Sequence, residues 1–386
     1  MPAKHCKRQL FVAGAGLRGT GYPNAWNTIE LIRQQNLAEV IDYSQWLPEG
    51  TQLWKITEKG TTRAGLFLAG LLFRNAFSLL RLVFRSPARS LTYVPYPGII
   101  FLWLSSWIPE RWRPLCICDA YITLWDTIYQ DRNLGHKESK LSRALLCIEA
   151  RALRTAHRIV TDTCSNAAHI ADLFKAPRTR LFAFPLAIPA PFTHSSKPSN
   201  PSDTKHLKVL FIGTFVPLQG TTVIAEAIHA LRNKTHIGFT IIGNGQDAEA
   251  TSKWLEKCPS ATWIRDWQPE EVLEHHMATA DICLGIFGGD GKASRVLPFK
   301  LYMALAGGKA IITQDTYGTP CGTPAIPALT CTPTPEGLAE AIVNLSEDEP
   351  LRRELQSKAR AYYEAHLSSP RLAEHWQTLL TRSSAP

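Results

Sequence analysis

Glycines and basic residues gather at one strand-to-helix junction in the second half of the chain, between Asp281 and Asp315. A buried-type strand there leads to Gly288-Gly289, and Lys292, Arg295 and Lys300 follow it. Pro298 suits the first turn of a helix, where its missing N–H costs nothing. A helix N-terminus and neighbouring cations together favour a diphosphate. The pattern predicts a diphosphate cradle, with a solvated cluster of surface charges as the alternative.

Glycine-rich loops follow two other predicted strands of the same half. Gly213-Thr214 ends a strand at 208–212, and Gly243-Asn244-Gly245 ends a strand at 239–242. In open α/β sheets, ligands bind outside the carboxyl ends of the strands. We therefore assign both loops to one donor pocket, with two ordinary strand-to-helix turns as the alternative. The full predicted donor-binding set is Gly213, Thr214, Gly243, Gly245, Trp267, Gly288, Arg295, Lys300 and Met303.

The first half carries a literal GxGxxG sequence after a predicted strand at 9–13. Asp42 lies at about the distance of a ribose-binding acid, so an NAD-dependent dehydrogenase is one interpretation. The next helix begins only near Asn24, which makes the loop longer than a tight dinucleotide turn. We favour a loop whose backbone N–H groups meet a phosphate or sugar, with a flexible connection as the alternative. The predicted loop residues are Gly14, Gly16, Arg18, Gly19 and Gly21.

The elements that position these loops are strands and helices in alternation, which is typical of parallel sheets with crossover connections. We predict strands at 9–13, 39–43, 91–94, 115–118, 158–161, 208–212, 239–242, 262–264, 282–286 and 310–313. We predict helices at 24–35, 139–156, 222–231, 269–279, 299–306, 336–345, 350–366 and 370–380. The fold class is therefore α/β.

The length of 386 residues favours two domains. A segment rich in proline and serine at 191–206 suits a linker, so we predict an N-terminal domain at 1–190 and a second domain at 207–368. A final segment at 369–386 carries the last helix. The net charge of +9 favours anionic partners without choosing among them. Scattered cysteines favour reduced thiols in a cytoplasmic protein over a metal site.

The segment 60–109 is both apolar and basic. No acidic residue lies between Lys59 and Glu110, whereas five arginines do, among leucines, phenylalanines and tryptophans. Such a segment can lie in the interface of an anionic membrane. The alternative is a set of core helices whose arginines reach solvent. We expect no nucleic-acid partner, because no nucleic-acid-binding module is recognised.

Several phrases of the second half resemble the GT-B-fold glycosyltransferases of the family 4 (group 1) type. GTFVPLQG is similar to the phosphate loop of that family, and IIGNGQ to its IIGxG turn. ADICLGIFG followed by RVLPFKLYMALAGGKAIIT resembles the donor-binding block, and the helices after Leu338 resemble the closing helices. The first half is similar more loosely, through DAYITLWDTIYQDR and EARALRTAHRIVTDT.

The resemblance implies two Rossmann-like domains facing a cleft, with the last helix crossing back to the first domain. It implies a hexosyltransferase-type enzyme that moves a sugar from a nucleotide diphosphosugar to an acceptor glycan or lipid-linked sugar, often with retention, in polysaccharide or glycoconjugate synthesis. It implies no metal or other cofactor, because basic groups and a helix N-terminus neutralise the leaving diphosphate. We expect the protein to be located in the cytoplasm or on the cytoplasmic face of the membrane.

The sequence departs from the family at several positions. Thr214 and Gln219 stand where the family often has Arg and Lys, and Arg295 and Met303 stand where it has two glutamates. Met303 cannot bind ribose hydroxyls as a carboxylate would, so a non-catalytic nucleotide-sugar-binding scaffold is a second interpretation. The family histidine near the donor sugar is not evident. Asp126 lies in that neighbourhood and is the predicted catalytic residue, with a structural ion pair or helix cap as the alternative.

Overall fold

The computed structural model of the chain describes residues 8–19, 22–48, 51, 61–188 and 206–382. The chain divides into two compact units. The N-terminal unit contains Met1–Tyr129, Leu134–Ala187 and Ser369–Pro386; the C-terminal unit contains Gln130–Asn133 and Ile188–Ser368. The predicted linker at 191–206 lies, except for His206, outside the described residues, so its role stays a prediction.

The N-terminal unit is built on a six-stranded parallel sheet in the order β3-β1-β5-β6-β7-β8. Its central strands are buried on both faces, as the all-buried β5 shows, which explains their continuous apolar sequences. The strands are β1 (Gln9–Val12), β3 (Glu39–Asp42), β5 (Leu91–Val94), β6 (Leu115–Asp119), β7 (Arg158–Thr161) and β8 (Leu181–Ala183).

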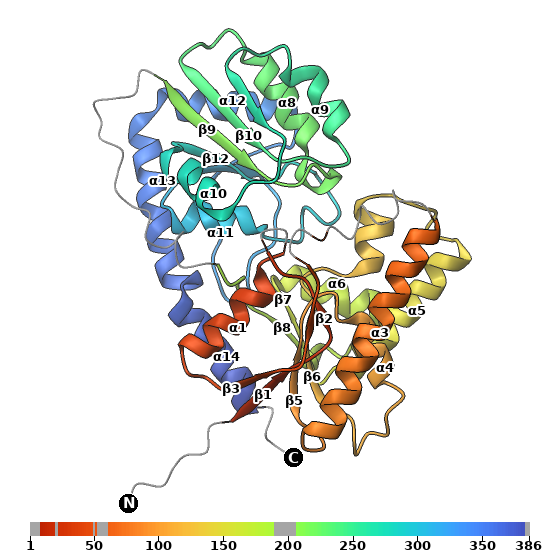
Figure 1. Cartoon of the computed structure of the whole chain (residues 1–386). Helices are drawn as coiled ribbons and strands as arrows, with labels where there is room; N and C mark the ends of the chain where they lie inside the picture. Colours follow the sequence, from red (N-terminus) through yellow and green to blue (C-terminus); the bar gives the residue numbers. More distant parts are fainter. Residues whose placement is uncertain (1–7, 20–21, 49–50, 52–60, 189–205, 383–386) are drawn as a thin grey trace, which may run out of the picture. The chain divides into compact units, whose positions relative to one another are not determined.

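Helices lie on both faces of this sheet, with α1 and α14 on one side and α3, α4 and α5 on the other (Figure 1). Their bounds are α1 (Asn24–Gln34), α3 (Thr61–Arg85), α4 (Ile99–Ser105), α5 (Lys140–Thr155), α6 (Cys164–Phe174) and α14 (Ser369–Arg382). Short helical turns lie at Asp126–Asp131 (η1) and Arg178–Arg180 (η2). The predicted last helix is thus confirmed, and it belongs to the N-terminal unit although it ends the chain.

Helix α14 completes the core of the N-terminal unit. Trp376 is 1% exposed, and its ring packs edge-on against Tyr93 of β5, with the ring centroids 5.7 Å apart. Phe184 lies at the same distance from Trp376 on another side. The guanidinium group of Arg8 donates a hydrogen bond to the carbonyl of Leu380. The burial of these aromatic rings fixes α14 to the sheet of the N-terminal unit.

The C-terminal unit repeats the plan with a parallel sheet in the order β11-β10-β9-β12-β13-β14. The strands are β9 (Leu207–Ile212), β10 (Ile237–Ile242), β11 (Ala261–Ile264), β12 (Ile282–Leu284), β13 (Ala310–Gln314) and β14 (Leu329–Cys331). The helices are α8 (Thr221–Ala230), α9 (Ala248–Leu255), α10 (Glu270–Thr279), α11 (Phe299–Ala306), α12 (Pro335–Glu347) and α13 (Glu349–Tyr362). Shorter turns lie at Pro217–Gln219 (η3) and Tyr363–Leu367 (η4).

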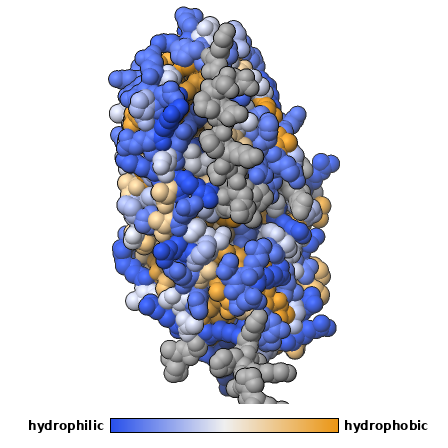
Figure 2. Space-filling model, turned by 90° about the vertical axis from the view of Figure 1, so that its left-hand side faces the viewer, coloured by the Kyte–Doolittle hydropathy of each residue, from blue (hydrophilic) through white to orange (hydrophobic). Residues whose placement is uncertain are grey.

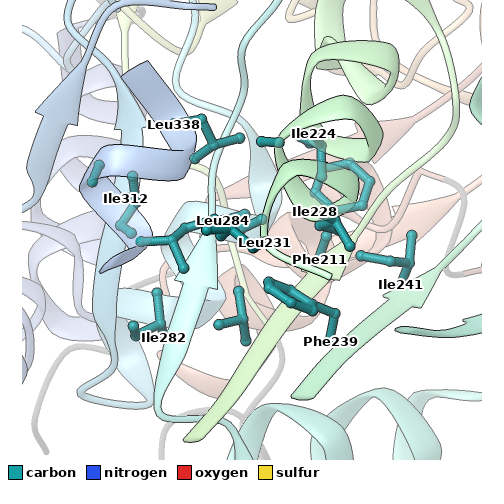
Figure 3. Packing of buried hydrophobic residues seen from close by; sticks show 14 of the residues in the cluster. Phe211, Ile224, Ile228, Leu231, Phe239, Ile241, Ile282, Leu284, Ile312 and Leu338 are labelled. Atoms are coloured by element: carbon teal, nitrogen blue, oxygen red, sulfur yellow. The ribbon is translucent and has the colours of Figure 1, made fainter. Parts of the chain in front are cut away.

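The core of this unit lies between β9, β10 and β12 and the apolar sides of α8 and α12. Phe211 and Phe239 from neighbouring strands meet Ile224 and Ile228 of α8, and Leu338 of α12 closes the cluster (Figure 3). These side chains alternate along the strands and recur every three or four residues along the helices. The same periodicities underlie the predicted elements at 208–212, 222–231 and 336–345, which the structure confirms.

Three local features were not predicted correctly. The helix expected at 350–366 is α13 followed by the π-helical turn η4, and the strand expected at 282–286 ends at Leu284. The GxGxxG segment contains a short strand β2 (Ala15–Gly16), which pairs with β4 (Gln45–Trp46). In the view of Figure 2, hydrophilic residues cover most of the visible surface, and hydrophobic residues form separate patches.

Candidate functional site

The carboxyl edge of the C-terminal sheet brings three loops into backbone contact. Phe215 after β9 forms a bridge with Gly245 after β10. Gly243 has a φ of +139°, and a Cβ atom there would lie 1.9 Å from the Gly213 carbonyl. A Cβ atom on Gly220 would likewise lie 2.2 Å from the carbonyl oxygen of Phe287, which follows β12. Only glycine permits these approaches, so the glycines of this edge join the loops to one another.

The amides of Gly213 and Gly243 are part of this joining. Gly213 N donates to the carbonyl of Ile242 at 3.0 Å, and Gly243 N donates to that of Ile264 at 3.0 Å. The Gly245 amide is held by the side-chain oxygen of Asn244 at 2.8 Å. These three N–H groups therefore hold neighbouring strands and loops together instead of pointing toward a ligand.

Lys300 lies beneath the Gly213 loop. It stands in the first turn of α11, is 8% exposed, and donates a hydrogen bond to Oε1 of Gln219. Its Nζ atom also lies 3.5 Å from the Gly285 carbonyl and 3.7 Å from the centre of the Phe211 ring. A Cβ atom on Gly213 would lie 2.6 Å from Nζ. The structure thus brings together a cation, the β9 loop and the end of β12.

Burial lowers the pKa of Lys300 well below its ordinary value, because the ammonium form loses its hydration. An anion beside this group would favour the charged form. Lys300 lies on α11, whose N-cap residue is Pro298. Proline offers no side-chain acceptor, so the first N–H groups of α11 are not bonded to a capping side chain. A buried cation at such a helix start is suited to bind a phosphate group.

The other predicted donor residues are arranged more loosely around this group. Arg295 bonds through Nε to the carbonyl of Gly291 in its own loop, at 3.0 Å. Gly288 packs on the η3 turn, because a Cβ there would meet the Leu218 carbonyl at 2.4 Å. Trp267, beyond the end of β11, is half exposed. Thr214 is partly buried in the β9 loop.

Met303 is a core residue. It is 3% exposed in α11, where every residue from Lys300 to Ala306 is buried. Its thioether accepts hydrogen bonds only weakly, so recognition of a ribose at this position lacks the strong acceptor that a carboxylate supplies.

The predicted loop of the N-terminal unit is buried instead of open. The Gly14 amide donates to Oγ of Ser78 at 2.8 Å, and the Ala15 amide donates to Oδ1 of Asn75 at 3.0 Å. Gly16 lies in β2, against the ring of Trp46. The expectation that these N–H groups face a ligand is therefore wrong for residues 14 and 15, because polar side chains of α3 accept from them.

The rest of that loop points elsewhere. The guanidinium group of Arg18 stacks over the ring of Trp26 at 4.1 Å, and Gly19 adopts a φ of +102°. Gly21 lies outside the described residues. Asp42 accepts from the Ser44 amide and the Trp46 indole, at 2.8 and 3.0 Å. The loop continues into β2 and not directly into α1, so the tight dinucleotide turn of a dehydrogenase is not formed.

Asp126 is 1% exposed at the start of η1, and its Oδ1 atom lies 3.4 Å from Nε2 of His169 in α6. Glu149 accepts the amides of Leu124 and Trp125 just before it, each at 2.8 Å. Asp126 thus has a structural neighbour in His169, in line with the structural role that the sequence left open as the alternative. Its catalytic role stays a prediction.

Sequence reasoning missed Asp119, the last residue of β6. It is 2% exposed at the carboxyl edge of the sheet, and it accepts hydrogen bonds from the hydroxyls of Tyr22 at 2.8 Å and Tyr93 at 3.1 Å. Burial raises the pKa of this carboxyl to about 6, although the tyrosine hydroxyls lower it. With Glu149 it borders a small pocket. An acid that ends the apolar run LCIC was the signal available in the sequence.

Comparison with known proteins decides the family. Residues 206–348 match the family described as glycosyl transferases group 1. The C-terminal unit therefore contains a group 1 glycosyltransferase domain. This match sets aside the dehydrogenase. No curated protein matches the sequence.

Solved structures of several glycosyltransferases share the fold along almost the whole chain. HepE of Anabaena, in complex with UDP, is 12% identical with a TM-score of 0.66, over 97% of this chain and 100% of that one. Sucrose-phosphate synthase of Thermosynechococcus elongatus is 14% identical with a TM-score of 0.67, over 97% and 99%. WaaG, a glycosyltransferase involved in lipopolysaccharide biosynthesis, is 15% identical with a TM-score of 0.65, over 97% and 99%. The chain therefore has the GT-B fold.

Proposed function

We propose that the C-terminal unit binds the diphosphate of a nucleotide-sugar donor at the carboxyl edge of its sheet. The observation that carries this proposal is the position of Lys300, a nearly buried cation in the first turn of an uncapped helix. A phosphate oxygen beside Nζ would compensate the hydration that burial removes. HepE, which shares the fold, has been solved with UDP and with UDP-glucose, and this supports the choice of ligand.

The remaining predicted residues complete this donor site. Thr214 follows β9, Gly288 follows β12 and Arg295 lies shortly before α11. We propose that these three residues contact the diphosphate. Trp267 offers a half-exposed ring at the end of β11, on which a nucleotide base can stack. Gly213, Gly243 and Gly245 act by letting the loops approach one another. Met303 shapes the floor of the site without a polar contact.

We propose that the sugar passes to an acceptor glycan or a lipid-linked sugar, with retention at the anomeric carbon. In that reaction the bond from the anomeric carbon to the leaving phosphate oxygen breaks, and a bond to the acceptor oxygen forms on the same face. The departing diphosphate takes the acceptor proton. Lys300 and the start of α11 stabilise the charge that develops on the diphosphate. No metal is required for this step.

We propose a role in polysaccharide or glycoconjugate synthesis on the cytoplasmic side of a membrane. WaaG, with the same fold, acts in lipopolysaccharide biosynthesis, and this supports a glycoconjugate acceptor. The predicted catalytic residue Asp126 and Arg18 belong to the N-terminal unit, to which we assign the acceptor.

Calorimetric titration with UDP, GDP and ADP tests the donor site. Lys300→Met removes the charge but keeps most of the side-chain volume. The matched control is Lys309→Met, because Lys309 is also a partly buried lysine of this unit. Lys309 precedes β13 and donates to the carbonyls of Ala278 and Ala280 at the opposite edge of the sheet. A charge-assisted hydrogen bond contributes about 1.5–3 kcal/mol, or about 10- to 100-fold in affinity.

We expect one nucleoside diphosphate to bind the wild type and the Lys309 variant equally, and the Lys300 variant at least about tenfold more weakly. Equal affinity of the two variants would contradict the assignment of Lys300. Hydrolysis of the matching nucleotide-sugar, followed by chromatography, then reports whether the bound donor is turned over.

A further inference from the structure

Helix α3 leaves a continuous apolar face exposed. Its 25 residues include large apolar side chains at positions 66, 73, 77, 80 and 84, which recur every three, four or seven residues and so share one side of the helix. These side chains, here called the outer face, are between 48% and 81% exposed: Leu66, Phe73, Phe77, Leu80 and Phe84. The rings of Phe73 and Phe77 stack on each other with their centroids 6.5 Å apart. An exposed patch of this kind marks a binding surface.

The opposite side of α3 is buried and hydrogen-bonded. Leu71, Leu79 and Leu82 pack inward, and Asn75 and Ser78 are completely buried between them. Oγ of Ser78 accepts the Gly14 amide and donates to the Tyr43 carbonyl at 2.8 Å. Asn75 accepts the Ala15 amide and donates to its own helix. These bonds attach α3 to the β1 loop along its inner side.

Basic residues form one edge of the outer face. Arg63, Arg74, Arg81 and Arg85 are separated by 11, 7 and 4 residues, spacings that place them along the same line of the helix. Arg81 lies partly over the ring of Tyr43, at 4.7 Å, and the other three are exposed. No acidic residue occurs in the sequence from 59 to 109, so this edge carries positive charge only.

We propose that the outer face of α3 binds the surface of a membrane that contains anionic lipids, with the helix parallel to that surface. The apolar side chains would enter the boundary between headgroups and acyl chains, and the arginine edge would meet the lipid phosphates. Lipid phosphate is the complementary charge for this edge, whereas a second copy of the chain would place arginines opposite arginines.

The helix lies on the membrane and does not cross it. By length and composition α3 is long and apolar enough for a span, with 28% of its most apolar window buried. Crossing would remove the buried side chains of Asn75 and Ser78 from their partners on Gly14, Ala15 and Tyr43. Buried amides without acceptors are costly, which favours the interfacial position.

This inference goes beyond the proposed function, because it concerns a surface that needs no sugar donor.

Flotation of the full-length chain with vesicles tests the proposal. Vesicles of phosphatidylcholine are compared with vesicles of equal parts phosphatidylcholine and phosphatidylglycerol, at low and high salt. Phe73→Ser with Phe77→Ser removes exposed rings of the outer face and leaves its buried side intact. Leu134→Ser is the matched control, because Leu134 is also half exposed but lies outside α3. Arg74→Glu with Arg85→Glu reverses two charges, and the corresponding lysine substitutions keep them.

We expect the wild type and Leu134→Ser to float with the anionic vesicles only, and less at high salt. The double serine variant should bind the anionic vesicles at least about tenfold more weakly. Each arginine replaced by glutamate should weaken this binding by about fivefold. The variant with lysines at positions 74 and 85 should bind as the wild type does. A wild type that does not float, or a double serine variant that floats equally well, overturns the proposal. The proposal is also overturned if sedimentation shows that the wild type is a dimer and that the double serine variant is not. UDP binding by the same preparations remains a separate measurement of the donor site.

Discussion

The ammonium group of Lys300 donates a hydrogen bond to Oε1 of Gln219, 81 residues away in the sequence. Gln219 occupies the position where the group 1 family often has a lysine. In the proposed donor site, Lys300 in the first turn of α11 supplies the cation that this loop lacks, and it is in contact with the glutamine. The absence of a Cβ atom at Gly213 leaves the space that Nζ occupies.

Replacing Gly213 with alanine should therefore displace the Lys300 side chain. The added Cβ atom would lie 2.6 Å from Nζ, the end of a flexible chain that can move without unfolding the unit. We expect UDP or the preferred nucleotide to bind about 10- to 100-fold more weakly in calorimetry. The control is Gly238→Ala in β10, where the nearest atom to a Cβ is the Leu207 carbonyl at 3.8 Å. Unchanged affinity in the Gly213 variant would argue against a role for Lys300 in binding.

Replacing Ser78 with alanine should destabilise the N-terminal unit by about 1–3 kcal/mol, because the Gly14 amide and the Tyr43 carbonyl both lose their buried partner. Urea denaturation followed by circular dichroism measures this difference. Ser86→Ala, just after the end of α3, removes the bonds to the Leu82 carbonyl and to the Ser90 hydroxyl from a partly buried site and should have a smaller effect. Vesicle binding should be retained in the folded Ser78 variant, since the outer face is unchanged.

Asp119 makes the stability of the N-terminal unit depend on pH. Its pKa is raised to about 6, chiefly by burial, compared with about 3.9 in an unfolded chain. The folded state therefore keeps a proton that the unfolded state loses. The stabilisation is fully present below about pH 4 and is lost as pH rises through about 6.

Asp119→Asn cannot ionise and should lack this dependence. The unfolding free energy of the wild type, relative to the variant, should fall by about 2 kcal/mol between about pH 4.5 and pH 7. Urea titrations at several pH values measure it. Asp172→Asn, at an exposed carboxyl of the same unit, is the control and should follow the wild type. A constant difference between wild type and Asp119→Asn would show that folding does not raise the pKa of this carboxyl.

The regular elements were largely predictable because apolar periodicity is a local property. The strand expected at 91–94 is β5, and the helix expected at 299–306 is α11, each with the predicted bounds. The family resemblance added the GT-B fold, which a count of strands and helices does not specify. Helix α3 was anticipated only as an apolar and basic segment, because its composition fits both a core helix and an interfacial one.

The contacts of the site could not be predicted, since they join residues far apart in the sequence. GxGxxG indicates an open phosphate loop by analogy, yet Ser78 and Asn75 accept the first amides of this one. The same holds for Asp119, whose two tyrosine partners come from positions 22 and 93. Only the tertiary structure determines whether a loop amide remains available to a ligand.

The position of α14 has a consequence for synthesis of the chain. Trp376 packs against Tyr93 and Phe184, so the core of the N-terminal unit lacks a large side chain until helix α14 has left the ribosome. The C-terminal unit, whose strands are translated later, can complete its own core first. The part of the protein that is made first is therefore the part that is finished last.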